Sequence, residues 1–144
     1  MTTNDYTCSI HAPVPPAEAY DKIARVADWW AKHFEGSARN PGDRFTVRFG
    51  ETFVDFAISE ARPDRAIVWQ VANCHLPWLK DKTEWNGTSV AWELVPGEGG
   101  TRVTMTHHGL TPGIECYGAC EGGWNRHIRE SLLAFLSQGK GNPT

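Results

Sequence analysis

The chain has 144 residues, a net charge of −3 and 22% charged residues, with acidic and basic side chains interspersed. This length suits a single domain over residues 1–144 with one sizeable core, and the composition is that of an ordinary globular protein. The charge pattern gives no surface for nucleic acid or anionic lipid, and no apolar run is long enough for a membrane span.

The first elements of the chain are a strand and a helix. Apolar and polar residues alternate over residues 6–10, which predicts a strand that ends before Pro13. From Ala17 to about Ala31 the apolar residues recur every three or four positions, which predicts a helix with proline in its first turn.

A long β region follows, in which rows of alternating apolar residues are separated by turn residues. The rows are Phe45/Val47/Phe49, Val54/Phe56/Ile58, Ile67/Trp69/Val71, Val90/Trp92/Leu94 and Val103/Met105. A period of two places each row on one face of a strand, so we expect five or six antiparallel strands with one apolar and one wet face. By the same parity Arg44, Arg48 and Arg102 belong to the wet face.

The last row continues to a histidine. The period of two predicts that His107 points inward at the strand end, whereas His108 points to solvent. An inward imidazole is costly to bury without a partner, so His107 is a candidate functional residue.

Beyond Pro112 the spacing becomes helical up to Gly139, and residues 139–144 read as a loose tail. Tyr117, Glu121 and Trp124 lie on the apolar stripe of this helix. Glu115 and His127 are interpreted more simply, as a first-turn carboxylate and part of a solvated face. The order of elements predicts an α+β fold in which this long C-terminal helix covers a curved sheet.

Short motifs spread along the chain carry a family likeness. They are Trp29-Trp30, Arg65-Ala66-Ile67-Val68-Trp69, Gly87-Thr88, Gly100-Thr101, Thr106-His107-His108-Gly109-Leu110, Gly123-Trp124 and Gly139-Lys140-Gly141. With them the chain resembles the SRPBCC superfamily, in particular its AHSA1-like branch (activator of Hsp90 ATPase homologue-like), related in fold to START and Bet v 1 proteins. The resemblance implies a helix-grip fold, a curved antiparallel sheet wrapped around the C-terminal helix, and a hydrophobic cavity between them.

The parity count indicates which side chains would face that cavity, and we expect them to bind its ligand. They are Phe45, Val47, Phe56, Trp69, Trp92, Met105 and His107 from the strands, and Tyr117, Glu121 and Trp124 from the helix. The predicted function is intracellular binding of a small hydrophobic or aromatic ligand whose polar end is selected by His107, Glu121 and Tyr117. The segment 73–79 could close over the cavity or form a plain surface loop.

His107 and Glu121 leave several interpretations open. They could pair as an acid/base couple, bind the polar group of a ligand, or lie where water reaches them, while His107 could instead cap the strand-to-helix loop through a backbone hydrogen bond. The first alternative function is therefore a cyclase-like or hydrolase-like enzyme with His107 as general base. No Ser/His/Asp order, phosphate loop or carboxylate pair supports an enzyme independently, so the sequence favours a binding protein. A cochaperone-like interaction protein is a second alternative, implied by the resemblance alone.

The four cysteines are predicted to be thiols. The N-terminus lacks the features of a secretion signal, so we expect a cytoplasmic protein without disulfides, in which Cys120 packs in the core and Cys116 is exposed. Cys116, Cys120 and His107 could form a zinc site, but the spacing is not distinctive, and we expect no metal or cofactor. The expected partner is a small hydrophobic molecule, and the chain could be a monomer or a homodimer.

Overall fold

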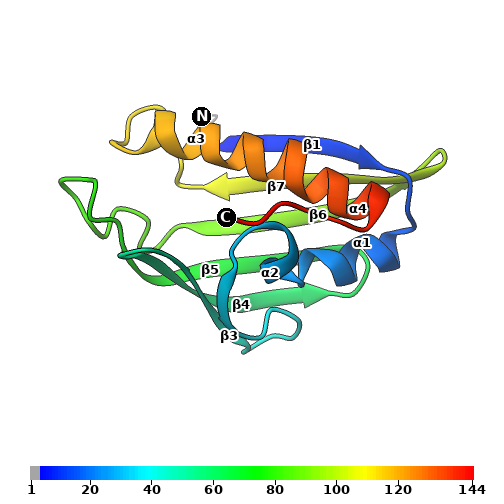
Figure 1. Ribbon diagram of the computed structural model, residues 1–144, viewed down its shortest axis with the longest axis horizontal. Helices are drawn as coiled ribbons and strands as arrows, with labels where there is room; N and C mark the ends of the chain where they lie inside the picture. The colour runs from blue at the N-terminus through cyan, green and yellow to red at the C-terminus, as the bar shows by residue number, and fades with distance from the viewer. Residues whose placement is uncertain (1–3) are drawn as a thin grey trace.

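Seven antiparallel strands form one sheet in the computed structural model, which describes residues 4–144 (Figure 1). The strands are β1 (Tyr6–Ala12), β2 (His33–Gly36), β3 (Arg44–Phe49), β4 (Thr52–Arg62), β5 (Ala66–His75), β6 (Ser89–Gly97) and β7 (Gly100–His108). Their order across the sheet is β1-β7-β6-β5-β4-β3-β2. The predicted strands are all present, and β2 is an additional short edge strand that pairs with β3.

The helices all lie on one face of the sheet (Figure 1). They are α1 (Pro16–Ile23), α2 (Val26–Trp29), α3 (Tyr117–Arg126), the π-helical segment η1 (His127–Leu132) and α4 (Leu133–Gln138). The last three run on from one another as a single long helix across the apolar side of the sheet, as the sequence predicts. The protein therefore has the α+β helix-grip fold.

Strand parity places the apolar rows against this helix. In β6 and β7 the inward residues Trp92 and Met105 are opposite each other, as are Val90 and His107. All four side chains are buried, while the neighbouring His108 is exposed. The inward direction predicted for His107 is confirmed.

Aromatic rings fill the middle of the space between sheet and helix. The ring of Trp69 lies nearly parallel to that of Trp30, at 6.1 Å between centroids, and packs edge-on against Phe45 and Phe56. Trp92 contacts Trp69 at 5.3 Å. Large apolar side chains in close contact contribute both hydrophobic burial and aromatic pairing to the core.

The predicted helix over residues 17–31 is in fact two helices. Arg25 has φ −86° and ψ 63°, which interrupts the helical path between α1 and α2. The indole N–H of Trp29, in α2, donates back to the carbonyl of Ile23, the last residue of α1, at 3.2 Å. Both Trp29 and the adjacent Trp30 are thereby buried in the core.

Residues 139–144 do not form the loose tail that the sequence predicts. The backbone N–H of Asn142 donates to Ser131 Oγ at 2.7 Å, and that of Thr144 donates to the carbonyl of Trp30 at 2.9 Å. The tail thus runs back along the helix towards α2 (Figure 1). Within residues 4–144, none of the helices combines the length and the apolar character needed to cross a bilayer.

Candidate ligand-binding site

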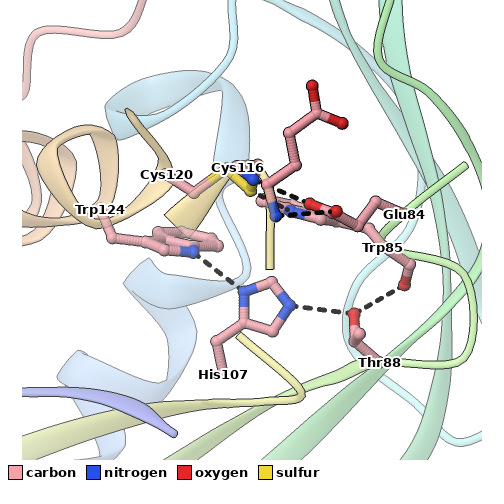
Figure 2. Close-up of a disulfide and its surroundings, with 8 residues drawn as sticks. Glu84, Trp85, Thr88, His107, Cys116, Cys120 and Trp124 are labelled. Carbon is pink, nitrogen blue, oxygen red and sulfur yellow. Dashed lines mark hydrogen bonds between the residues drawn. A yellow bond between two sulfur atoms is a disulfide. The ribbon is translucent and has the colours of Figure 1, made fainter. Parts of the chain in front are cut away.

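His107 lies at the end of β7 with no exposed surface and hydrogen bonds on both ring nitrogens (Figure 2). The indole N–H of Trp124 can only donate, so Nδ1 of His107 accepts this bond at 3.1 Å. The ring proton therefore sits on Nε2, which donates to Thr88 Oγ1 at 2.9 Å, and the Thr88 hydroxyl donates onward to the carbonyl of Trp85 at 2.7 Å. Burial lowers the pKa of His107 to about 3, which keeps the ring neutral.

These bonds decide between the interpretations that the sequence leaves open. His107 does not pair with Glu121, because Glu121 accepts a hydrogen bond from the hydroxyl of Tyr117 at 2.9 Å instead. The two hydrogen bonds of the His107 ring are to side chains, Trp124 and Thr88, and not to the backbone. Both ring nitrogens are engaged, which leaves neither free to take a proton from a substrate.

The strand residues predicted to bind ligand are buried but form the packed core. Phe45, Val47, Phe56, Trp69, Trp92 and Met105 are each at most 2% exposed. Tyr117 and Glu121 are half-buried on the helix and bond to each other. Of the whole predicted set only Trp124 borders the cavity described next.

A cavity of about 360 Å³ opens where α3 passes the ends of β3 and β4. We call it the α3 cavity. Its lining comes from the end of α2, the β3–β4 hairpin, the loop between β5 and β6, helix α3, the start of η1 and the C-terminal tail. The lining residues are Trp30, Phe49, Thr52, Val54, Leu76, Trp78, Trp85, Ala119, Cys120, Gly123, Trp124, Arg126, His127 and Thr144. The volume lies in the range of pockets that hold small organic molecules.

The lining of the α3 cavity is aromatic with one charged side chain. Four indoles contribute to it, and those of Trp85 and Trp124 are stacked at 6.1 Å with 9° between their planes. Arg126 is the charged side chain, and it forms no ion pair within the part of the chain that the structure describes. His127 is buried beside it, not solvated as predicted, and burial together with the Arg126 charge lowers its pKa to about 4.

Two glutamates tie the β5–β6 loop to the start of α3. The Glu84 carboxylate accepts the backbone N–H groups of Glu115 and Cys116 at 3.0 and 2.9 Å. In return, the Glu115 carboxylate accepts the backbone N–H groups of Lys80 and Asp81, at 2.9 and 3.2 Å. Glu115 is therefore a loop anchor just before the helix, not the simple first-turn carboxylate that the sequence predicts.

The segment 73–79 is partly strand and partly cavity wall. Residues up to His75 belong to β5, and the side chains of Leu76 and Leu79 are buried. Trp78 is 51% exposed and borders the α3 cavity. Whether this segment opens and closes stays a prediction.

Cys116 and Cys120 form a disulfide, so the prediction that both are thiols is wrong (Figure 2). The Cα atoms are 5.7 Å apart across the first turn of α3, within the usual range for a disulfide, and this turn is what brings the two residues together. Cys116 is 1% exposed, contrary to prediction, and Trp85 Nε1 donates to its sulfur at 3.2 Å. Cys8 and Cys74 are buried free thiols, and residues 4–144 contain no cluster suited to a metal ion.

Comparison with known proteins agrees with the fold and identifies the family. The family model described as "Activator of Hsp90 ATPase homolog 1-like protein" matches residues 18–137. The chain belongs to this family. It is thus a member of the AHSA1-like branch of the SRPBCC superfamily, while no curated protein sequence matches it significantly.

Solved structures of AHSA1-like and related proteins show the same fold at low identity. The Aha1 dimer from Colwellia psychrerythraea has a TM-score of 0.79 and 23% identity, over 98% of this chain and 100% of that one. Protein MLL2253 from Mesorhizobium loti has a TM-score of 0.74 and 17% identity, over 92% of this chain and 95% of that one. DynU16, a putative protein of the dynemicin biosynthetic locus, has a TM-score of 0.70 and 20% identity, and this chain spans 49% of it.

Proposed function

We propose that this protein binds a small, flat, largely apolar molecule with an anionic group in the α3 cavity. The observation that carries the proposal is the lining itself, four indoles and further apolar side chains with one cation, Arg126, that has no ion pair among residues 4–144. Pockets of this size with few polar groups are typical of small-molecule sites, where the polar group fixes orientation. A small hydrophobic or aromatic ligand is the class predicted from the sequence, but the anionic group is added here, and the proposed site lies beside the aromatic core instead of within it.

The energetics favour an aromatic ligand. Burial of apolar ligand surface contributes about 25 cal/mol per Å², and stacking on an indole adds about 0.5–1.5 kcal/mol. Trp78, half-exposed at the edge of the cavity, has room to pack against an entering ring. The guanidinium of Arg126 offers a carboxylate two parallel N–H donors. His107 has no free ring nitrogen with which to act as general base, so the proposal is for binding and not for catalysis.

Titration with a charged and a neutral naphthalene tests the proposal. Tryptophan fluorescence should saturate with both 1-naphthoate and 1-naphthalenemethanol, and 1-naphthoate should bind more tightly. Arg126→Gln should weaken naphthoate binding by about three- to tenfold and affect the alcohol little, consistent with the loss of a partly exposed charged hydrogen bond.

Two further variants sharpen this test. Trp78→Ala should weaken binding of both compounds, because it removes apolar contact area. Arg129→Gln is the matched control, since Arg129 is also exposed on the C-terminal helix but does not border the cavity. The proposal fails if neither compound gives a saturable signal, or if Arg129→Gln weakens naphthoate binding as much as Arg126→Gln does.

A further inference from the structure

The Cys116–Cys120 disulfide lies in the helical wall of the α3 cavity and contacts the opposite wall through Trp85. Cys120 borders the cavity from α3. Cys116 accepts a hydrogen bond from the indole of Trp85, which borders the same cavity from the β5–β6 loop. Figure 2 shows the disulfide between the helix that carries Trp124 and the side chain of Trp85. The sulfur–sulfur bond therefore fixes the position of the Cys116 sulfur that accepts the hydrogen bond from Trp85.

The disulfide closes the first turn of α3, a helix whose sequence is a weak helix former. Gly118, Gly122 and Gly123 lie within the helix, and glycine is the least favourable residue there apart from proline. Cys116, at the N-cap position, makes no side-chain capping hydrogen bond. A covalent link between positions four apart restrains the turn, and its loss leaves the carboxylate of Glu84 as the main restraint.

We propose, building on the function proposed above, that the Cys116–Cys120 disulfide is a reversible redox site that controls ligand affinity in the α3 cavity. The reductant is a dithiol. One of its thiolates attacks Sγ of Cys120, the sulfur–sulfur bond breaks, and Cys116 leaves as a thiolate that takes up a proton. The second thiolate of the reductant then attacks the reductant's own sulfur in the mixed disulfide, and Cys120 leaves as a thiolate that takes up a second proton. Two electrons pass to the protein, and the reductant becomes a disulfide.

Access and packing assign different roles to the two cysteines. Cys116 is 1% exposed beneath Trp85, whereas Cys120 is 9% exposed and borders the cavity, so the attacking thiolate reaches Cys120 through the cavity. After reduction the sulfurs must separate to non-bonded contact, and the open space next to Cys120 is the cavity. Reduction thus narrows the cavity and loosens its helical wall. By linkage, a ligand that prefers the oxidised form also disfavours reduction.

Titration of oxidised and dithiothreitol-reduced protein with 1-naphthoate tests the inference. Alkylation after unfolding should count two thiols in the oxidised protein, Cys8 and Cys74, and four in the reduced protein. The oxidised form should bind 1-naphthoate at least fivefold more tightly, and saturating 1-naphthoate should slow reduction. The double variant Cys116→Ser/Cys120→Ser should bind like the reduced form, while the control Cys74→Ser should keep the redox dependence.

The outcomes separate this inference from the proposed function. Four thiols in air-oxidised protein, or equal affinity in both redox forms, overturn the redox control and leave ligand binding intact. Absence of 1-naphthoate binding in both forms rejects the proposed function, and the control of affinity with it. Tighter binding by the reduced form also overturns the inference, because the cavity would then open and not narrow on reduction.

Discussion

At the residue scale, the direction of His107 could be predicted from the sequence but its partners could not. Parity of the β7 row places the imidazole inward, and the structure confirms this. Its two partners, Thr88 and Trp124, come from the β5–β6 loop and from α3, and no local pattern reports which loop meets which helix. The sequence also predicted Glu121 as a ligand-binding residue or a partner of His107, because it lies on the apolar stripe. In the structure its carboxylate accepts a hydrogen bond from Tyr117, one turn away.

A neutral, buried His107 predicts acid sensitivity. Its folded pKa of about 3 is below the unfolded value of about 6.5, so the unfolded state binds more protons as the pH falls. The contribution of His107 to the free energy of unfolding is complete above pH 6.5 and is lost as the pH falls to about 3. Between pH 7.5 and pH 5 the loss is about 2 kcal/mol. His127, whose pKa is about 4, adds a similar loss.

Urea unfolding of wild type and His107→Gln at pH 7.5 and pH 5 measures this contribution. The variant should be less stable at pH 7.5, because Trp124 and Thr88 lose their shared partner. Between the two pH values it should nevertheless lose about 2 kcal/mol less than wild type. Parallel losses in the two proteins would mean that His107 does not stay neutral in the fold.

At the element scale, α3 combines a weak helical sequence with outside support. Periodicity predicts the helix, because its apolar stripe is clear. The support is invisible in the sequence, since Glu84 lies on a distant loop and accepts the N–H groups of Glu115 and Cys116. The disulfide was missed for a different reason, because a cytoplasmic protein was expected and its cysteines were therefore predicted to be thiols.

Replacement of the exposed helical glycines tests how weak α3 is. A Cβ at Gly118 or Gly122 meets no atom within 4 Å, so alanine fits without displacing a neighbour. Each substitution should raise the free energy of unfolding by about 0.5–1 kcal/mol through helix propensity. Chemical denaturation gives the value, and an unchanged or lower stability would contradict the interpretation.

Removal of the Glu84 carboxylate tests the loop anchor. Glu84→Ala should lower the free energy of unfolding by about 1–2 kcal/mol, because two backbone N–H groups at the start of α3 lose their acceptor. Glu98→Ala, on the exposed β6–β7 turn, is the control and should change little. Amide hydrogen exchange should also become faster at residues 115–120. An effect of Glu84→Ala no larger than that of the control would show that the Glu84 carboxylate does not stabilise the start of α3.

At the scale of the whole molecule, periodicity was sufficient for the fold but not for the cavity. Alternation and helical spacing determine which residues face inward, and they correctly give an α+β fold with the C-terminal helix over the sheet, while the helix grip came from the family resemblance. How far the inward side chains fill the interior depends on ring sizes and rotamers, as in the contacts of Trp69 with Trp30, Phe45 and Phe56. The α3 cavity lies beside this core and not within it.

The seven tryptophans provide the most direct measurement of where a ligand binds. Each indole N–H gives its own signal in a ¹H–¹⁵N correlation spectrum, which can be followed during titration with 1-naphthoate. Binding in the α3 cavity predicts that Trp30, Trp78, Trp85 and Trp124 shift together, while Trp29, Trp69 and Trp92 shift little. Shifts centred on Trp69 and Trp92 would place the ligand inside the core instead, and a spectrum unchanged at saturating 1-naphthoate would contradict ligand binding altogether.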